Sequence, residues 1–358
     1  MVGAWLLSRY IGQAVLTGIV LTCLLLVSIH LLIDFIREAR SLTGDYGSVQ
    51  MLWYLLQTTP RRLYDIFPFA ALIGTLVGLG SLASANELVA MRAAGFDRGH
   101  LTGRVLLAVI ACILLMMAVA EWLIPDLETR ARAERQQARS GQLHVGDLGR
   151  LWLRDGHYVI RLERSLWRAE TELEFVDALI YRIDESMRPQ RVMQAERAIH
   201  WGDHWRLENV SVRVLGEEGT GQVVDAMQLA SRLSPEVFIA AVSRPRLLAI
   251  SDLQIMRDYL RRGGLDDSVY EQAFWQRVFF PLNVLAMVLV ALPFAFRGGR
   301  GGLQGAGLFI GVLLGLLFFV LSRLTQSLAM VWPLPLWLSM LLPAVVIIGA
   351  SLLFLRRL

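Results

Sequence analysis

The stretch Gln13-Ala-Val-Leu-Thr-Gly-Ile-Val-Leu-Thr-Cys-Leu-Leu-Leu-Val-Ser-Ile-His-Leu-Leu-Ile33 contains no Asp, Glu, Lys or Arg. An α-helix needs about 20 apolar residues to cross ~30 Å of hydrocarbon, so this stretch predicts a membrane-spanning helix. It follows Arg9, as the core of a signal peptide would, but it is longer than such a core and no small-x-small cleavage site ends it. We therefore interpret it as a retained span.

Five further stretches have a similar length and few charges. They cover residues 66–85, 105–124, 278–296, 301–322 and 336–355. Hydrophobic residues make up 55% of the 358 residues and charged residues 18%, and the mean hydropathy is +0.50, which excludes an ordinary soluble domain. The sequence predicts a polytopic α-helical membrane protein with six transmembrane helices and both termini on the same side.

Two of the predicted spans carry informative internal residues. Pro281 and Pro293 interrupt the fourth span and predict kinks, because proline lacks the amide hydrogen that the helix needs. In the fifth span Gly307, Gly311 and Gly315 recur every four residues, a pattern typical of close helix packing.

The segment between the third and fourth spans has the composition of a soluble domain. It begins with a helical arm at residues 126–140, rich in arginine and glutamate, and Asp155-Gly156 then predicts a tight hairpin turn. Further strands are predicted at residues 173–183, 190–200, 204–215 (after a turn at Gly202-Asp203) and 221–231. Short strands with turn signals between them favour an antiparallel sandwich or jellyroll. We expect three regions: helices at 1–125, the β-jellyroll with helical flanks at 126–266, and helices at 267–358.

Two short helices are expected from capping patterns. Ser84 followed by Glu87 has the spacing of a capping box, and Gly95 supplies a left-handed stop. Leu88, Met91 and Gly95 share one side of this helix, whereas Glu87, Ala90 and Ala94 form an adjoining strip of small and acidic character. Such a short helix needs support from the membrane surface, the spans or a partner protein. Ser251-Asp-Leu-Gln254 repeats the capping pattern before Gly263-Gly264.

All 35 basic residues are arginine, and the absence of lysine restricts the chemistry of the chain. A P-loop needs a lysine to reach the terminal phosphates, so a separate subunit must hydrolyse any ATP that drives this protein. Cys23 and Cys112 lie inside predicted spans and imply no disulfide framework. Arginine counts on the short loops weakly favour cytoplasmic termini, but the arginines that flank the insert leave the orientation open.

Three motifs in this order resemble the permease subunits of the lipopolysaccharide export ABC transporter, the LptF/LptG family, and lie nearer to its LptG branch. They are Arg9-Tyr-Ile-Gly12, Glu87-Leu-Val-Ala-Met-Arg-Ala-Ala-Gly-Phe96 and Glu121-Trp-Leu-Ile-Pro125. The resemblance covers the whole chain, because three spans, a β insert and three more spans form an unusual arrangement. It implies a permease in the inner membrane of a Gram-negative bacterium, with cytoplasmic termini and a periplasmic jellyroll.

The resemblance also implies the partners. They are a sister permease in a heterodimer, two copies of a cytoplasmic ABC ATPase that bind ATP and Mg²⁺, a single-span membrane-anchored periplasmic jellyroll protein, lipopolysaccharide and membrane lipids, with no nucleic acid. This chain itself needs no cofactor. The complex would extract lipopolysaccharide from the inner membrane and pass it to a periplasmic jellyroll bridge toward the outer membrane.

In this family the segment between the second and third spans is the coupling helix seated in a groove of the ATPase. The resemblance therefore assigns ATPase coupling to Glu87, Leu88, Met91, Arg92 and Gly95, with Glu87 matching the acidic residue of the family. The alternative is that Glu87 only caps its own helix.

The candidate substrate-binding residues are arginines near the outer span ends and large apolar residues of the fifth span. A guanidinium group can donate two parallel hydrogen bonds to one phosphate, so we expect Arg37, Arg40, Arg61, Arg62 and Arg323 to bind the phosphates of the substrate. The alternative is that these arginines contact ordinary anionic lipids. Arg323 could instead form a salt bridge with Asp34, a position where LptG-like relatives tend to have a basic residue. Acyl chains would contact Leu308, Phe309, Leu313 and Phe318.

We predict no catalytic or metal-binding residues. His144, His157, His200 and His204 are scattered over the insert without suitable ligand partners, so we interpret them as ordinary histidines. Two other classes of function stay open: a membrane-anchored periplasmic scaffold or sensor without transport activity, and a secondary transporter. The secondary transporter would require carboxylates near mid-span, whereas the ionisable residues here cluster at span ends.

Overall fold

The computed structural model divides the chain into two units, which are described separately. The helical unit comprises Met1–Arg37, Thr58–Ile124 and Glu271–Leu358, and the insert unit comprises Glu38–Gln57 and Pro125–Tyr270. The structure describes residues 2–40, 42, 46–140, 151–162, 164–169, 172–184, 186, 188–201, 204–215, 221–231, 233, 237, 240–241, 244–297, 303–331 and 335–357.

The helical unit contains long apolar helices where the charge-free stretches predict them. They are α1 (Val2–Ala39), α3 (Thr59–Ser84), α5 (Arg98–Ala118) with the π-helical turn η1 (Val119–Leu123), α9 (Ser268–Val278), α10 (Phe280–Arg297), α11 (Leu303–Val331) and α12 (Leu336–Arg357). Within the described residues, five helices are long and apolar enough to cross a membrane, or six if α9 and α10 form one bent span. The polytopic helical prediction is confirmed.

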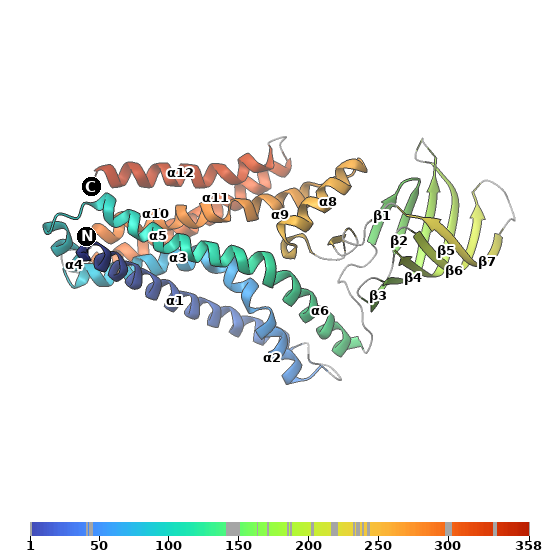
Figure 1. Cartoon of the computed structure of the whole chain (residues 1–358), viewed down its shortest axis with the longest axis horizontal. Coiled ribbons are helices and arrows are strands. Elements are labelled where there is room, and N and C mark those ends of the chain that lie inside the picture. The colour runs from blue at the N-terminus through green and yellow to red at the C-terminus, as the bar shows by residue number, and fades with distance from the viewer. Residues whose placement is uncertain are drawn as a thin grey trace. The chain divides into compact units, whose positions relative to one another are not determined.

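Both termini lie at one end of the helical unit. Figure 1 shows the start of α1 and the end of α12 at the same end as the short helix α4 (Glu87–Ala93). With α9 and α10 counted as one bent span, the described helices cross the unit six times, and an even number of spans returns the chain to the side on which it began. The short helix between α3 and α5 therefore lies on the side of the termini.

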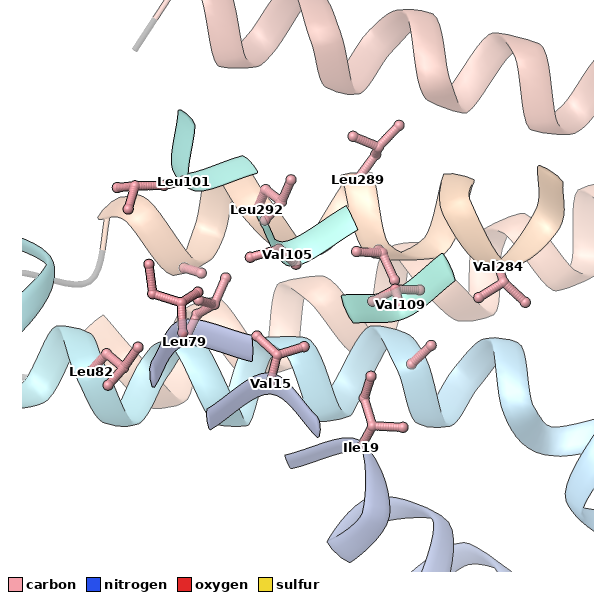
Figure 2. Packing of buried hydrophobic residues seen from close by; sticks show 14 of the residues in the cluster. Val15, Ile19, Leu79, Leu82, Leu101, Val105, Val109, Val284, Leu289 and Leu292 are labelled. Carbon is pink, nitrogen blue, oxygen red and sulfur yellow. The ribbon is translucent and has the colours of Figure 1, made fainter. Parts of the chain in front are cut away.

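An apolar core joins α1, α3, α5 and α10. Its buried residues include Val15 and Ile19 of α1, Leu79 of α3, Val105 of α5 and Val288 of α10. Figure 2 shows side chains from these four helices converging on one another. Residues 284–292 of α10 are buried except Leu285, so α10 is enclosed by its neighbours on most sides.

Glycines let α1 and α3 approach backbone to backbone. A methyl group added at Gly18 of α1 would collide with the carbonyl of Gly74, and one added at Gly74 or Gly78 of α3 would collide with the backbone of α1. Small residues at four-residue spacing permit such close helix packing in membranes. These three glycines set the position of α1 against α3.

The glycines of α11 also serve packing, as their spacing predicts. Methyl groups added at Gly311 and Gly315 would collide with the side chains of Leu76 and Leu72 on α3. The packing interpretation is confirmed for these two positions, while the side chain environment of position 307 lies outside the described residues. As a result α3 lies between α1 and α11.

The fourth predicted span is broken at its start. α9 and α10 meet at an angle of 50° around Phe279, one residue before the start of α10. Pro281 lies in the first turn of α10, where a missing amide hydrogen costs little. α10 continues through Pro293 as a helix, so Pro293 does not end it.

The insert unit contains short helices and one antiparallel sheet. The helices are α2 (Ser48–Gln57), α6 (Ile124–Ser140), the 3₁₀ turn η2 (Pro245–Leu247) and α8 (Ile250–Arg262). The strands are β1 (Leu151–Asp155), β2 (Tyr158–Leu162), β3 (Arg164–Ala169), β4 (Glu172–Ile183), β5 (Pro189–Trp201), β6 (His204–Val214) and β7 (Gly221–Ala230). Their order is β1-β2-β4-β5-β6-β7, and β3 also pairs with β4.

The strand predictions agree with this sheet except at β3. The hairpin at Asp155-Gly156 is confirmed, because β1 pairs with β2 and Gly156 has φ +59°. β2 pairs with the end of β4 (Tyr158 opposite Arg182), whereas β3 pairs with its beginning (Arg164 opposite Val176). The strand β3 follows β2 so closely that no turn signal separates them. Gly202 and Asp203 lie outside the described residues.

Asp177 of β4 and Asn209 of β6 interrupt the regular alternation of the sheet. Both residues have left-handed backbones, with φ +57° and +51°, which Asp and Asn tolerate better than most residues. On β4 the buried apolar positions include Phe175 before Asp177, and Ala178 and Ile180 after it. The buried positions therefore shift by one residue at Asp177, so the same face of the sheet stays apolar on both sides of it.

A buried polar network lies in the insert. The Ser231 hydroxyl donates to Oδ2 of Asp155 at 2.7 Å and lies 3.1 Å from Nε2 of His200. In a hydrolytic triad the histidine stands between the serine and the acid, whereas here the serine is in the middle. His200 is 1% exposed, so we assign this network to the core of the sheet. Among the described residues no group of three or more His, Cys, Asp or Glu could hold a metal ion.

Candidate functional site

The short helix α4 begins differently from the predicted capping box. Ser84 is the last residue of α3, and its hydroxyl donates to the carbonyl of Ser81 at 2.7 Å. Asn86 has φ +59°, and its carbonyl accepts the amide of Ala90 at 3.1 Å, so Asn86 starts α4. The capping box is wrong because α3 continues as far as Ser84. The same pattern fails at Ser251, where α8 begins at Ile250 without a side-chain cap.

The end of α4 matches the prediction. Gly95 has φ +90°, and the amide of Phe96 donates to the carbonyl of Met91 at 3.1 Å, as in a Schellman cap. The left-handed stop at Gly95 is confirmed. Gly264 likewise has φ +66° after α8, so the predicted helix end there is also correct.

One face of α4 belongs to the bundle core. Leu88 and Met91 are 5% and 8% exposed and pack in the apolar cluster of α1, α3 and α5. Val89 is 53% exposed, and Ala90 and Ala93 are exposed as well. Leu88 and Met91 therefore attach α4 to the spans, and the face that a partner can reach is the small apolar face of Val89, Ala90 and Ala93.

Glu87 lies at the boundary between the spans and α4. The side chain of Tyr10 on α1 lies close enough to interact with its carboxylate. One carboxylate oxygen of Glu87, Oε2, is buried and has no hydrogen-bond partner among the described residues. A buried carboxylate oxygen without a hydrogen bond is costly. The side chain of Arg92 lies outside the described residues.

Asp34 pairs with Arg62 rather than with Arg323. Nε of Arg62 lies 2.6 Å from Oδ2 of Asp34, and Nη1 of Arg62 donates to the hydroxyl of Thr58. The Arg62 side chain is only 7% exposed. The alternative of a bridge between Asp34 and Arg323 is wrong, because the carboxylate of Asp34 pairs with Arg62 of α3. Arg62 joins α1 to α3 and its guanidinium is withdrawn from the surface.

The other arginine candidates differ in exposure. Arg37 is 77% exposed and lies 3.7 Å from Asp34. Arg61 is 33% exposed and lies 3.9 Å from Asp65. Arg40 and Arg323 are exposed, and the Arg323 guanidinium lies 5.3 Å from the centroid of the Phe319 ring. Arg37, Arg40 and Arg323 are thus the candidates most accessible to a phosphate.

Exposed apolar residues cover α1 and α11 on either side of α3. On α11, Phe309 is 69% exposed and Leu313 is 51% exposed. Val77 of α3 is 43% exposed. It lies in the part of α3 that contacts α1 and α11 through the glycine contacts described above. From Val20 onward, the large apolar residues exposed on α1 are Val20, Leu21, Leu24, Leu25, Ile29, Leu32, Ile33, Phe35 and Ile36. We call the exposed apolar residues of α1, α3 and α11 the lipid-facing surface.

Two further residues, Phe318 and Leu308, are also predicted to contact acyl chains. Phe318 is 5% exposed and packs with Leu72 and Met287 inside the bundle, so its position differs from the expected contact with acyl chains. It lies one turn from Gly315 on the face that contacts α3. The side chain of Leu308 lies outside the described residues.

Two buried charged groups have no counterpart among the predicted site residues. In the insert unit, the Glu38 carboxylate accepts hydrogen bonds from Tyr46 at 2.9 Å and from Arg135 at 2.5 and 3.0 Å, and Arg135 lies 5.1 Å from the Tyr54 ring centroid. Burial and the bond to Glu38 raise the pKa of Tyr46 to about 12. In the helical unit, Arg277 is buried and contacts a backbone carbonyl. The signal for both was a charge next to a predicted span.

These features define a multi-pass helical membrane protein with an inserted antiparallel β domain and a short helix on the side of its termini. Residues 9–357 match the family described as lipopolysaccharide export system permease LptF/LptG. The chain is 33% identical over 356 residues to the lipopolysaccharide export system permease protein LptG of Escherichia coli K12, covering 98% of each chain. It is 31% identical over 349 residues to LptG of Haemophilus influenzae, covering 96% of each. The chain belongs to the LptF/LptG permease family.

Proposed function

We propose that this chain is the permease subunit of an ATP-driven exporter that extracts lipopolysaccharide from the inner membrane and passes it to a periplasmic jellyroll bridge. The observation that carries the proposal is the lipid-facing surface of α1, α3 and α11, with exposed arginines near the ends of two of its helices. The relatives named as lipopolysaccharide export permeases supply the substrate class.

The two kinds of surface suit the two parts of a phosphorylated glycolipid. Phe309 and Leu313 offer contacts for acyl chains in the hydrocarbon, where apolar side chains cost nothing to expose. Arg37, Arg40 and Arg323 offer guanidinium groups that form charge-assisted hydrogen bonds with phosphate. Arg62 has a different role, because its guanidinium is engaged with Asp34.

The chain acts with several partners in this proposal. Two copies of a cytoplasmic ABC ATPase hold ATP and Mg²⁺ and contact α4 through Val89, Ala90 and Ala93. Glu87 accepts a hydrogen bond from the ATPase. A sister permease completes the lipid cavity, and a single-span membrane-anchored jellyroll protein receives the substrate from the insert, on the periplasmic side of the inner membrane.

The packing suggests how a movement of α4 caused by the ATPase is transmitted to the helices of the lipid-facing surface. Leu88 and Met91 join α4 to the core that α1, α3 and α5 share. α3 in turn contacts α1 through Gly74 and Gly78 and contacts α11 through its leucines. Because these contacts are rigid and close, movement of α4 shifts α1 and α11 together.

Site-specific photocrosslinking tests the proposal. A photoreactive phenylalanine at Leu313 on α11 should form lipopolysaccharide adducts in the complex with the sister permease and the ATPase, and ATP should diminish them. Val346 on α12 is a matched control because it is 58% exposed, similar to Leu313 at 51%, on a different helix. Adducts of equal yield at both positions, or adducts at Leu313 that ATP leaves unchanged, would favour a scaffold or sensor instead.

A further inference from the structure

The helix that leads into the insert has an unusual hydrogen-bond pattern over η1. The amide of Ile124 donates to the carbonyl of Val119, five residues back. In a regular α-helix this amide would bond the carbonyl of Ala120, four residues back. The next residue, Pro125, has no amide hydrogen to offer. The Ala120 carbonyl therefore lacks both of the backbone donors that an α-turn or a π-turn would supply.

Arg277 of α9 supplies the missing donor. Its Nη1 atom lies 2.7 Å from the Ala120 carbonyl oxygen, and the residue is 7% exposed. The guanidinium also lies 6.0 Å from the centroid of the Tyr64 ring, which stacks on Phe280 at 4.1 Å. An arginine buried beside membrane spans is costly unless its donors are used, so a specific partner is expected. The orphaned carbonyl is such a partner.

The contact joins the two places where the chain leaves and re-enters the helical unit. The chain leaves the helical unit after Ile124 and re-enters it at Glu271. η1 is widened by its π-turn, and α9 ends in the 50° break before α10. Both helices thus depart from regular geometry close to this hydrogen bond, and π-turns are frequent at functional sites.

We propose that Arg277 is a positioning residue that attaches the helix entering the insert to the helix leaving it, so that a movement of one is passed to the other. Pro125 creates the need for this bond, because it withholds the amide that would otherwise serve Ala120. The segment Glu121-Trp-Leu-Ile-Pro125 thereby acquires a physical role. The inference does not depend on what the protein transports.

Hydrogen–deuterium exchange on the full chain in lipid nanodiscs tests the proposal. Arg277→Met should speed exchange of the amides in residues 119–124 about tenfold, the factor expected for loss of one charge-assisted hydrogen bond. Pro125→Ala restores an amide at position 125, so the double variant Pro125→Ala/Arg277→Met should return to nearly the original rate. Arg277→Lys should be intermediate, since it keeps the charge but not the guanidinium geometry.

Arg213→Met on β6 is the matched control, because Arg213 is an exposed arginine and its removal should leave the exchange of residues 119–124 unchanged. The proposal is overturned if Arg277→Met exchanges like the parent chain, or if Pro125→Ala fails to rescue it. If Arg277→Met does not fold, recovery of a folded chain in the double variant supports the proposal, and an unfolded double variant contradicts it.

Discussion

Nε of Arg62 lies 2.6 Å from Oδ2 of Asp34, so an ion pair joins the end of α1 to the start of α3. The Asp34 side chain is 28% exposed, and the arginine is almost fully enclosed. Removing one partner from such a pair leaves a charge without compensation in a poorly solvated position. The pair therefore stabilises the helical unit and is separate from the exposed arginines that suit phosphate.

The first prediction concerns this ion pair. Asp34→Asn should lower the free energy of unfolding by about 3 kcal/mol, the lower end of the range for a broken buried pair. Arg37→Gln is the control and should change it by less than about 1 kcal/mol, because Arg37 is 77% exposed. Unfolding in detergent, followed by tryptophan fluorescence, measures both. Equal losses for the two variants would show that the pair is unimportant.

The second prediction concerns the close approach of α1 and α3. A methyl group at Gly78 would collide with the backbone of Ala14, so Gly78→Ala should destabilise the chain by about 1–3 kcal/mol or more. Gly80 lies two residues away with no atom within 4 Å of its added methyl group. Gly80→Ala should be neutral or stabilise by about 0.5–1 kcal/mol. Thermal unfolding of both variants checks the contrast, and a similar response at both positions would refute the packing.

The third prediction separates the two faces of α4. Val89→Glu should reduce co-purification of the ATPase about tenfold while the chain stays folded, because an interface that loses ~1.4 kcal/mol binds tenfold more weakly. Leu88→Ala should instead cost about 2–5 kcal/mol of stability, since Leu88 is buried in the core. Affinity purification and thermal unfolding are measured on the same samples. If Val89→Glu retains the ATPase fully, the exposed face of α4 is not the docking face.

The fourth prediction concerns pH. The pKa of Tyr46 is about 12 in the folded chain and about 10 in an unfolded chain. Between these values the unfolded chain loses the phenolic proton while the folded chain keeps it, so the stabilising contribution is complete below pH 10 and is lost as the pH rises to 12. Tyr46→Phe should make the melting temperature fall less steeply over this window. A parallel decline in both proteins would contradict the raised pKa.

The sequence allowed prediction of elements whose signals are local. Charge-free stretches located the spans because burial in hydrocarbon demands about 20 apolar residues. Alternation and turn residues located β4 to β7, and Gly95 marked a left-handed backbone that glycine adopts without strain. Each of these signals lies within the element that it predicts.

The incorrect or missing predictions have two causes. Some residues contact a residue that is distant in the sequence, and others belong to a neighbouring helix instead of the predicted one. Ser84 and Glu87 have the spacing of a capping box, but α3 extends far enough to include Ser84. Asp34 binds an arginine 28 residues away, and no periodicity indicates which of several arginines arrives there. Phe309 and Phe318 look alike in sequence, yet only the packing of α11 on α3 decides that Phe318 is buried.

The most direct test of the account is ATP-dependent release of lipopolysaccharide from vesicles that contain this chain, its sister permease and the ATPase. Labelled lipopolysaccharide should leave the vesicles for an added soluble jellyroll acceptor only when ATP is present, and Val89→Glu should reduce this release about tenfold, in step with the weaker association of the ATPase. Release without ATP, or no release from a complex that hydrolyses ATP normally, would contradict the proposed function.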